Sequence, residues 1–171
     1  MSRPLLFALA LLLAAPPLAR AETGALARVA QLEAAVAAIE AGRPAQARRL
    51  LKPLAEDGSA LAETLLGGLY ARGLGGPRDL PAAVGFWWRA AQRGYAPAQL
   101  ALAQALATGQ GVAASPDHAY RWALLAARSG DDAVRAAAER LRIDLGRRIG
   151  AEASGRMGAK ADAFRPWSPT E

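Results

Sequence analysis

Three glycines recur at a fixed interval along the chain. Gly58, Gly94 and Gly130 lie 36 residues apart. The stretches that end at them, AQARRLLKPLAEDG, PAAVGFWWRAAQRG and HAYRWALLAARSG, carry small and bulky residues at matching positions. A period of this length predicts a stack of similar units, because one such unit cannot bury its apolar face alone.

Each unit is predicted to form two helices. Asp79 and Ser115 stand where a helix needs an N-cap, since each follows the second glycine of a linker by four residues. Their side-chain oxygens can accept a free backbone N–H, and Pro116 suits the first helical position. The glycines fit the left-handed residue that ends a helix, because only glycine reaches this conformation without a side-chain clash.

Small and bulky side chains at matched positions are predicted to pack the units together. Phe86 and Trp122 share one repeat position and are expected in the core between helices, whereas Trp87 is expected between units. Ala62 and Ala98 match in the second helix of their units. The residues expected to shape the repeat are Gly58, Gly94, Gly130, Gly73, Gly75, Gly109, Gly111, Ala62, Ala98, Phe86, Trp87 and Trp122.

The second unit shows the pattern most completely, in FWWRAAQRGYAPAQLALAQALATGQGV, residues 86–112. This succession of an aromatic pair, two alanines, a glycine, A-Q-x-x-L-A and a closing G-x-G-V resembles the Sel1-like repeat, a relative of the tetratricopeptide repeat. The resemblance implies an all-α fold, a short right-handed α-solenoid of stacked antiparallel helix pairs. It implies no catalytic residue, because the residues of this pattern serve packing.

We divide the chain into three repeats with a capping helix at each end. The repeats span 44–79, 80–115 and 116–146, and the third is degenerate because it lacks the paired glycines. Terminal units of a finite stack are commonly atypical. Residues 22–43 are predicted to form the N-terminal capping helix, and residues 147–171 the C-terminal capping helix and tail.

The C-terminal helix carries a narrow apolar stripe and three glycines. Each glycine costs on the order of 1 kcal/mol of helix propensity, so this helix is expected to form only when docked. We expect it to cover the third repeat, with Phe164 or Trp167 as its anchor and the last four residues loose. The stripe consists of Ile149, Ala153, Met157 and Ala161.

The N-terminus has the features of a secretory signal peptide over residues 1–21. Arg3 precedes an apolar run at 5–15, and an A-x-A cleavage site follows at 19–21. The run has about half the ~20 residues needed to span a bilayer, which disfavours a membrane anchor. We therefore expect cleavage after Ala21 and a periplasmic or secreted chain with no stable membrane anchor.

The charge of the chain is modest and dispersed. The formal net charge is +6, and removing the predicted signal peptide leaves 19 basic and 15 acidic residues, a net charge of +4. Scattered basic side chains indicate solvated helix faces rather than a nucleic-acid groove, so no nucleic-acid partner is expected. The chain has no cysteine, so its fold does not rely on disulfides.

The sequence offers little for enzyme chemistry. His118 is the only histidine, lies near the start of a predicted helix and lacks an obvious catalytic partner. With no cysteine and one histidine, the usual zinc ligands are missing. No serine begins S-x-x-K, and the motifs GLGG and GQG follow helices and lack G-K-[ST]. We predict a protein that is not an enzyme, with no cofactor and no metal.

The function implied by the resemblance is that of an adaptor, because exported bacterial proteins with this repeat regulate envelope signalling or assemble polysaccharide machinery. We therefore expect a protein or peptide partner. Trp88 points about 100° away from its neighbour on the helix and either covers an adjoining segment or anchors a partner. The alternative function is a cell-wall or polysaccharide-binding module. The candidate contacts are Trp88, Arg89, Arg93, Tyr95 and Tyr120.

Overall fold

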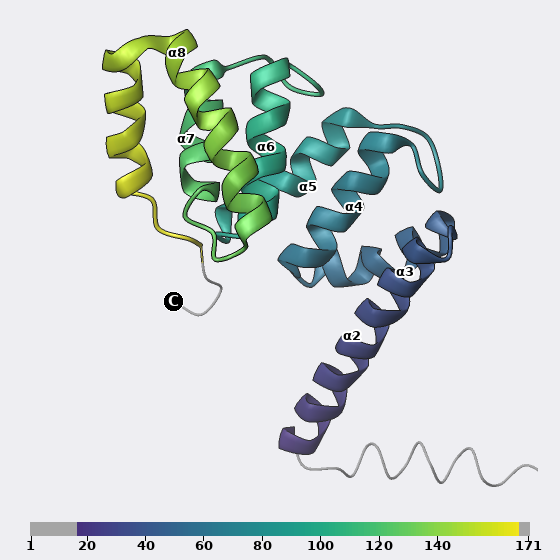
Figure 1. Ribbon diagram of the computed structural model, residues 1–171. Helices are drawn as coiled ribbons and strands as arrows, with labels where there is room; N and C mark the ends of the chain where they lie inside the picture. The colour runs from purple at the N-terminus through teal and green to yellow at the C-terminus, as the bar shows by residue number, and fades with distance from the viewer. Residues whose placement is uncertain (1–16, 168–171) are drawn as a thin grey trace, which may run out of the picture.

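The computed structural model describes residues 17–167, and within that range the chain forms seven helices and no strand. Consecutive helices pack side by side into a solenoid (Figure 1), which confirms the predicted all-α architecture. Most of the predicted signal peptide, residues 1–16, lies outside the described residues. The helices are α2 (Pro17–Glu40), α3 (Pro44–Glu56), α4 (Ala60–Arg72), α5 (Leu80–Gln92), α6 (Ala96–Thr108), α7 (Pro116–Ala126) and α8 (Asp132–Asp162).

The first helix begins earlier than expected. α2 starts at Pro17 and therefore runs through the predicted cleavage position into the predicted N-terminal cap. Its C-terminal half docks on α3, where the Gln31 side-chain amide donates a hydrogen bond of 2.7 Å to the carbonyl of Leu50. Within residues 17–167, no helix combines the length and the apolarity needed to cross a membrane.

Glycines end most of the helices as predicted. Gly73 and Gly109 are the left-handed C-caps of α4 and α6, with φ of 66° and 75°. Gly58 and Gly94 lie one residue beyond the C-caps of α3 and α5 and have φ of 85° and 82°. The same conformation at 36-residue intervals confirms that these segments are structural repeats.

The prediction for Gly130 is wrong, because this glycine does not have a positive φ. α7 ends at Ala126, two residues earlier in the repeat than α3 and α5. Polar side chains make the following turn instead: Ser129 Oγ accepts from the backbone N–H of Asp131, and the Asp131 carboxylate caps α8. A left-handed glycine is not needed once side chains satisfy the helix ends.

The two predicted N-cap residues differ in whether their side chains cap the helix. Asp79 caps α5 through its side chain, which accepts a 2.9 Å hydrogen bond from the backbone N–H of Ala82. Ser115 occupies the N-cap position of α7, but its side chain makes no capping hydrogen bond, and Pro116 follows it. Proline removes one free N–H from the first turn of α7 and presets its φ.

Gly75 and Gly111 let the linker at the end of each repeat lie against the start of the same repeat. A Cβ on Gly75 would lie 2.5 Å from the backbone of Pro44 and Ala45, and one on Gly111 would lie 2.5 Å from the Leu80 carbonyl group. Pro44 and Leu80 are themselves 36 residues apart. The two linkers therefore make the same backbone contact, and that contact leaves no room for a side chain.

The core consists of two clusters of buried side chains, one from α2, α3 and α4 and the other from α5 to α8. Ala62 and Ala98 are fully buried, which allows the helices to approach closely. Trp122 is the largest fully buried residue, with 1% of its surface exposed, in agreement with its predicted place in the core. Trp87 packs between units as predicted: its indole lies against Gly67 of α4, and its Nε1 donates to the carbonyl of Thr64.

Phe86 is less buried than its repeat position predicts. Its ring is half-buried, with its centroid 5.5 Å from that of Tyr70, and the Arg89 guanidinium covers it at 4.7 Å. Trp122, at the equivalent position, is covered by later elements of the chain. Equivalent positions of the repeat are therefore buried to different extents, because different segments of the chain pack over them.

The C-terminal cap begins at a break inside α8. Gly150 has φ 82° and ψ 171°, values outside the helical region, and the residues after it return beside the first half of α8 (Figure 1). The turn therefore falls three residues after the predicted start of this cap. In the predicted stripe Ile149 is half-buried, whereas Ala153, Met157 and Ala161 are buried.

The tail after α8 is anchored by Phe164. Its ring packs edge-on against Trp122 with centroids 5.6 Å apart. Trp167, the other predicted anchor, is 55% exposed. Phe164 therefore closes the core, and the residues that follow it run over the surface of α5.

Candidate functional site

A groove forms where the C-terminal tail crosses α5. Its volume is about 480 Å³. The α5 side contains three of the five predicted contact residues, and the tail adds two residues that were not predicted as contacts. The lining residues are Trp88, Arg89 and Gln92 of α5, its C-cap residue Arg93, and Arg165 and Trp167 of the tail.

One side of the Trp88 ring packs against the core, and the other side is exposed to solvent. Its ring packs edge-on against Trp122 with centroids 5.7 Å apart, and Phe164 packs on Trp122 in turn. Even so, 44% of Trp88 is exposed. This geometry combines the two interpretations of Trp88, because the indole covers the core and presents a fixed apolar surface to the groove. A tryptophan that is already immobilised loses little entropy when a partner binds.

A buried carboxylate fixes Arg89 of α5 and Arg93, the C-cap residue of that helix. Glu63 of α4 is fully buried, and its Oε1 and Oε2 each lie 2.7 Å from a nitrogen, Arg89 Nε and Arg93 Nη1 respectively. Charge-assisted hydrogen bonds of this length are stronger than neutral ones. Arg93 also places its guanidinium 5.0 Å from the centre of the Trp167 ring. The positive edge of the groove is therefore preorganised.

Glu63 is absent from the residues that the sequence pattern singles out, although a signal for it exists. It lies 36 residues before Gln99, the glutamine of the A-Q-x-x-L-A pattern, and Gln99 is also buried. A charged residue in a core-facing column requires a partner. Arg89 and Arg93 are those partners, and the corresponding residues one repeat later are Leu125 and Ser129. The tail residues Arg165 and Trp167 have no repeat-based signal, because they lie outside the periodic region.

Replacing Glu63 by glutamine is expected to keep the fold and lower the free energy of unfolding by about 1–2 kcal/mol. Glutamine occurs at the equivalent position, where the Gln99 amide donates to the Ala91 carbonyl. The loss is limited because Arg89 and Arg93 are partly solvated and can recover hydration. Urea unfolding measured by circular dichroism gives this difference.

The reciprocal change, Gln99→Glu, is the matched control. It introduces a carboxylate where the repeat provides Leu125 and Ser129 instead of two arginines. A buried unpaired charge costs several kcal/mol, so we expect a loss of about 3 kcal/mol or more. Equal losses in the two variants would show that the arginine pair does not stabilise Glu63.

The two predicted tyrosines lie outside the groove. Tyr95 is half-buried at the N-cap of α6, and burial, followed by the nearby Asp131 carboxylate, raises the pKa of its phenol. Tyr120 is only 7% exposed, and its hydroxyl accepts a hydrogen bond of 3.2 Å from Arg142 of α8. Placing Tyr120 among the contact residues is therefore wrong, because α8 covers the face of α7 that carries it.

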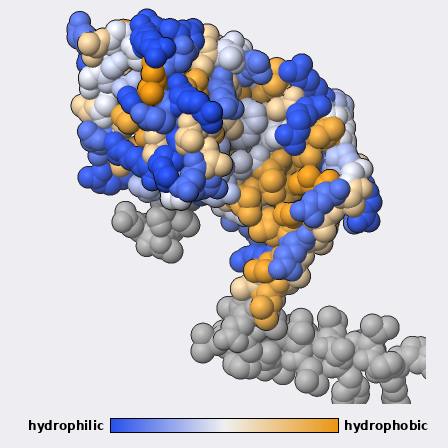
Figure 2. All heavy atoms as spheres, viewed as in Figure 1, coloured by the Kyte–Doolittle hydropathy of each residue, from blue (hydrophilic) through white to orange (hydrophobic). Residues whose placement is uncertain are grey.

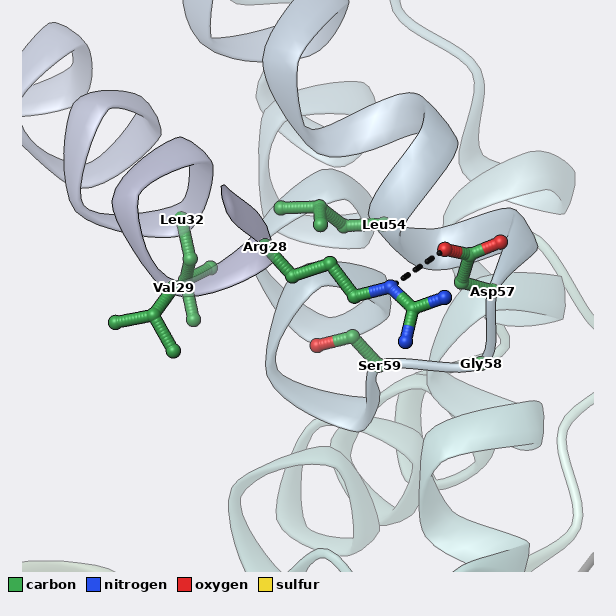
Figure 3. A pocket seen from close by; sticks show the side chains of 7 residues that line it. All are labelled: Arg28, Val29, Leu32, Leu54, Asp57, Gly58 and Ser59. Atoms are coloured by element: carbon green, nitrogen blue, oxygen red, sulfur yellow. Dashed lines mark ion pairs between the residues drawn. The ribbon is translucent and has the colours of Figure 1, made fainter. Parts of the chain in front are cut away.

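A second hollow lies at the N-terminal end, where α2 meets the turn between α3 and α4 (Figure 3). It has a volume of about 340 Å³, and an ion pair of 3.1 Å between Arg28 and Asp57 crosses it. Figure 2 shows apolar residues gathered along α2 and the adjoining N-terminal half of the solenoid, whereas the surface over α8 is mainly hydrophilic.

Each hollow contains an ion pair from the same repeat position, but the residue at that position is acidic in one hollow and basic in the other. Asp57 and Arg93 are 36 residues apart and occupy the same position after α3 and α5. Asp57 pairs with Arg28 on α2, and Arg93 pairs with Glu63 on α4. An ion pair from this turn to the preceding helix therefore recurs, and it is the buried pair on Glu63 that orders the groove.

Among the described residues, no three histidine, cysteine, aspartate or glutamate side chains cluster in a way that would hold a metal ion. The groove is lined by three arginines, and the carboxylate behind it, Glu63, is engaged by two of them. The arrangement offers aromatic surface and fixed positive charge.

Two segments of the chain match the family model of the Sel1 repeat, residues 60–95 and 96–131. This chain is a Sel1-repeat protein. Each matched segment has the predicted period of 36 residues but starts at the second helix of a pair, α4 or α6, and ends in the turn after the next helix. The groove residues Trp88, Arg89 and Arg93 therefore lie in the first matched repeat, together with Glu63.

Solved structures with a similar fold include a Sel1 repeat protein from Oxalobacter formigenes, with a TM-score of 0.59 and 23% identity. A protective antigen of uropathogenic Escherichia coli that displays an SLR fold has a TM-score of 0.55 and 20% identity. The comparisons cover 78% and 84% of this chain but only 60% and 34% of those proteins. At these identities the likeness concerns the fold alone. No curated protein sequence matches this Sel1-repeat protein significantly.

Proposed function

We propose that this Sel1-repeat protein is an exported, non-enzymatic scaffold that binds another protein through the groove on α5 and acts in an envelope process. Sel1-repeat proteins are generally protein-interaction scaffolds. Export is supported by the basic start, apolar run and A-x-A site of residues 1–21. N-terminal sequencing of the periplasmic chain tests this part, since cleavage after Ala21 leaves Glu22 first.

The observation that carries the proposal is the half-exposed Trp88 beside two arginines held by a buried carboxylate. Tryptophan and arginine dominate the binding energy of protein interfaces, especially where their side chains are ordered before binding. The groove is therefore suited to a partner segment that supplies an apolar side chain for Trp88 and a carboxylate for the arginine edge. Complementary charge of this kind also increases the rate of encounter.

The test is photo-crosslinking in living cells that produce the full chain. A photoreactive amino acid at Gln92 probes the groove, and one at Ile143, which is exposed on α8, serves as the control position. We expect adducts with a defined envelope protein from position 92 but not from position 143. Trp88→Ala is expected to reduce the yield of the adduct at least tenfold, since hot-spot tryptophans contribute about 2 kcal/mol or more.

Adducts that persist unchanged in Trp88→Ala would contradict the proposal. The variant also loses the edge contact with Trp122, so its thermal unfolding is measured alongside. Arg89→Gln is the second variant, because it removes positive charge from the groove while the glutamine side-chain N–H, at the position of Arg89 Nε, can still donate to Glu63.

Salt separates this function from the alternative of an anionic cell-wall polymer. Binding of a polyanion to the arginines should weaken steeply as screening rises. A partner anchored on Trp88 should keep most of its affinity, because burial of apolar surface is little affected by screening. Loss of the complex between about 50 mM and 300 mM salt would therefore favour the polysaccharide.

A further inference from the structure

The C-terminal tail forms one side of the groove and crosses the end of α5 as an extended segment. Beyond the end of α8 no regular helix continues within the described residues, and the backbone N–H of Trp167 donates a hydrogen bond of 2.8 Å to the carbonyl of Gln92. This carbonyl belongs to the last turn of α5, where helix carbonyls lack intrahelical partners. The tail therefore satisfies a backbone group that the helix leaves free.

The side chains of the tail contact the groove in the manner of a bound peptide. The ring of Pro166 lies over Gly94, so that a Cβ on this glycine would be 3.1 Å from Pro166 Cγ. Arg93 stacks over the Trp167 ring at 5.0 Å, a cation–π arrangement. One backbone hydrogen bond, a proline over a glycine and an aromatic ring on an arginine make a small recognition site.

The two ends of the tail are held unequally. Phe164 packs into the core against Trp122, whereas Trp167 is 55% exposed. The part of the tail at Pro166 and Trp167 can therefore lift from the groove while Phe164 stays in place. Lifting exposes the Gln92 carbonyl, the Gly94 surface and the guanidinium of Arg93.

We propose that the tail is a self-ligand of the groove, and that the partner binds by inserting an extended segment with a proline followed by an aromatic residue in place of Pro166 and Trp167. This inference rests on the proposed function and names the chemistry of the partner segment. Pro166 fits this exchange because proline presets an extended backbone. The tail competes from within the same molecule, where effective concentrations reach the millimolar range.

The experiment measures binding of a synthetic peptide to the full chain. The probe is a fluorescein-labelled peptide of residues 162–171, and the matched control peptide carries alanine at the positions of Pro166 and Trp167. Binding is followed by fluorescence anisotropy to wild type and to a tail-disabled variant, Phe164→Ala/Pro166→Ala/Trp167→Ala. A second variant, Pro166→Ala/Trp167→Ala, keeps Phe164 on Trp122 and serves if the triple variant does not fold.

We expect the peptide to bind a tail-disabled variant at least tenfold more tightly than wild type, because the internal competitor is gone. The control peptide should bind neither protein, and adding Arg93→Ala to the variant should weaken peptide binding at least fivefold. Wild type and variant that bind the peptide equally would overturn the inference, as would a folded variant that binds no peptide at about 1 mM, the effective concentration of a linked tail.

The crosslinking assay separates this inference from the function on which it rests. Disabling the tail is expected to raise the yield of adducts at position 92 at least threefold. Adducts that depend on Trp88 but are unchanged when the tail is disabled would refute the self-ligand and leave the scaffold function standing. Adducts independent of Trp88 would refute the function itself.

Discussion

Replacing Trp122 by alanine is expected to lower the free energy of unfolding by about 3–5 kcal/mol. The indole is 1% exposed and contacts both Trp88 and Phe164, so its removal leaves a cavity and frees the tail anchor. Domains are stable by about 5–15 kcal/mol, and this single change therefore removes a large part of the total. Urea unfolding followed by circular dichroism measures the loss.

The repeat supplies a matched control for this variant. Phe86 occupies the position 36 residues earlier and is only half-buried. Phe86→Ala removes less buried surface and should cost about 1–2 kcal/mol at the usual area coefficient. If the two variants lost the same stability, the unequal burial of these equivalent positions would have no energetic consequence, and the role assigned to the C-terminal cap would be wrong.

Gly111→Ala is also expected to be strongly damaging, with a loss of about 3 kcal/mol or more. The new Cβ would lie 2.5 Å from the carbonyl group of Leu80, and the backbone has φ of 76°. Both backbone segments would have to move, and the left-handed conformation itself costs about 1–2 kcal/mol for a residue with a side chain. Gly75→Ala makes the equivalent clash with Pro44 and is expected to behave alike.

Two other glycines test whether this effect is specific. Gly85 lies inside α5, and a Cβ added there would meet no atom within 4 Å, so Gly85→Ala should stabilise the protein by about 0.5–1 kcal/mol. Gly130 has open space and no positive φ, and its replacement should be near neutral. A large loss in Gly130→Ala would contradict the turn geometry after α7. Thermal unfolding of all four variants makes the comparison.

Much of the fold could be predicted because its signals are local. Gly73 and Gly109 end helices for a reason that a single residue carries, namely access to a left-handed backbone. Asp79 caps α5 through its own side chain. Such features recur every 36 residues, so one assignment predicts its copies except where the repeat degenerates, as at Ser115 and Gly130.

The wrong predictions share a cause. Those for Gly130 and Tyr120 fail where a non-equivalent segment follows the repeat, and Phe86 packs against the core but is less buried than expected. Ser129 and Asp131 shape the turn at Gly130, and α8 covers Tyr120 through Arg142. A period describes the average unit, whereas the environment of a residue depends on what packs against that particular unit.

The candidate site likewise contains residues that could be selected from the sequence and a pairing that only the structure shows. Trp88, Arg89 and Arg93 could be selected from the sequence because aromatic and basic residues on one helix suggest a contact surface. Their fixed positions depend on Glu63, which is 26 and 30 residues away in the chain from the two arginines. No local pattern contains that pairing, since it exists only once α4 and α5 are packed together.

The amino-acid sequence by itself determined the repeat length, the helical class and the sites where helices end, because these follow from the conformational preferences of single residues and from periodic burial. Only the tertiary structure decided that Glu63 clamps two arginines, that Gly150 breaks α8, and that the tail lies in the groove on α5. These features are contacts between segments distant in the chain, and their energies depend on which surfaces meet after the stack has formed.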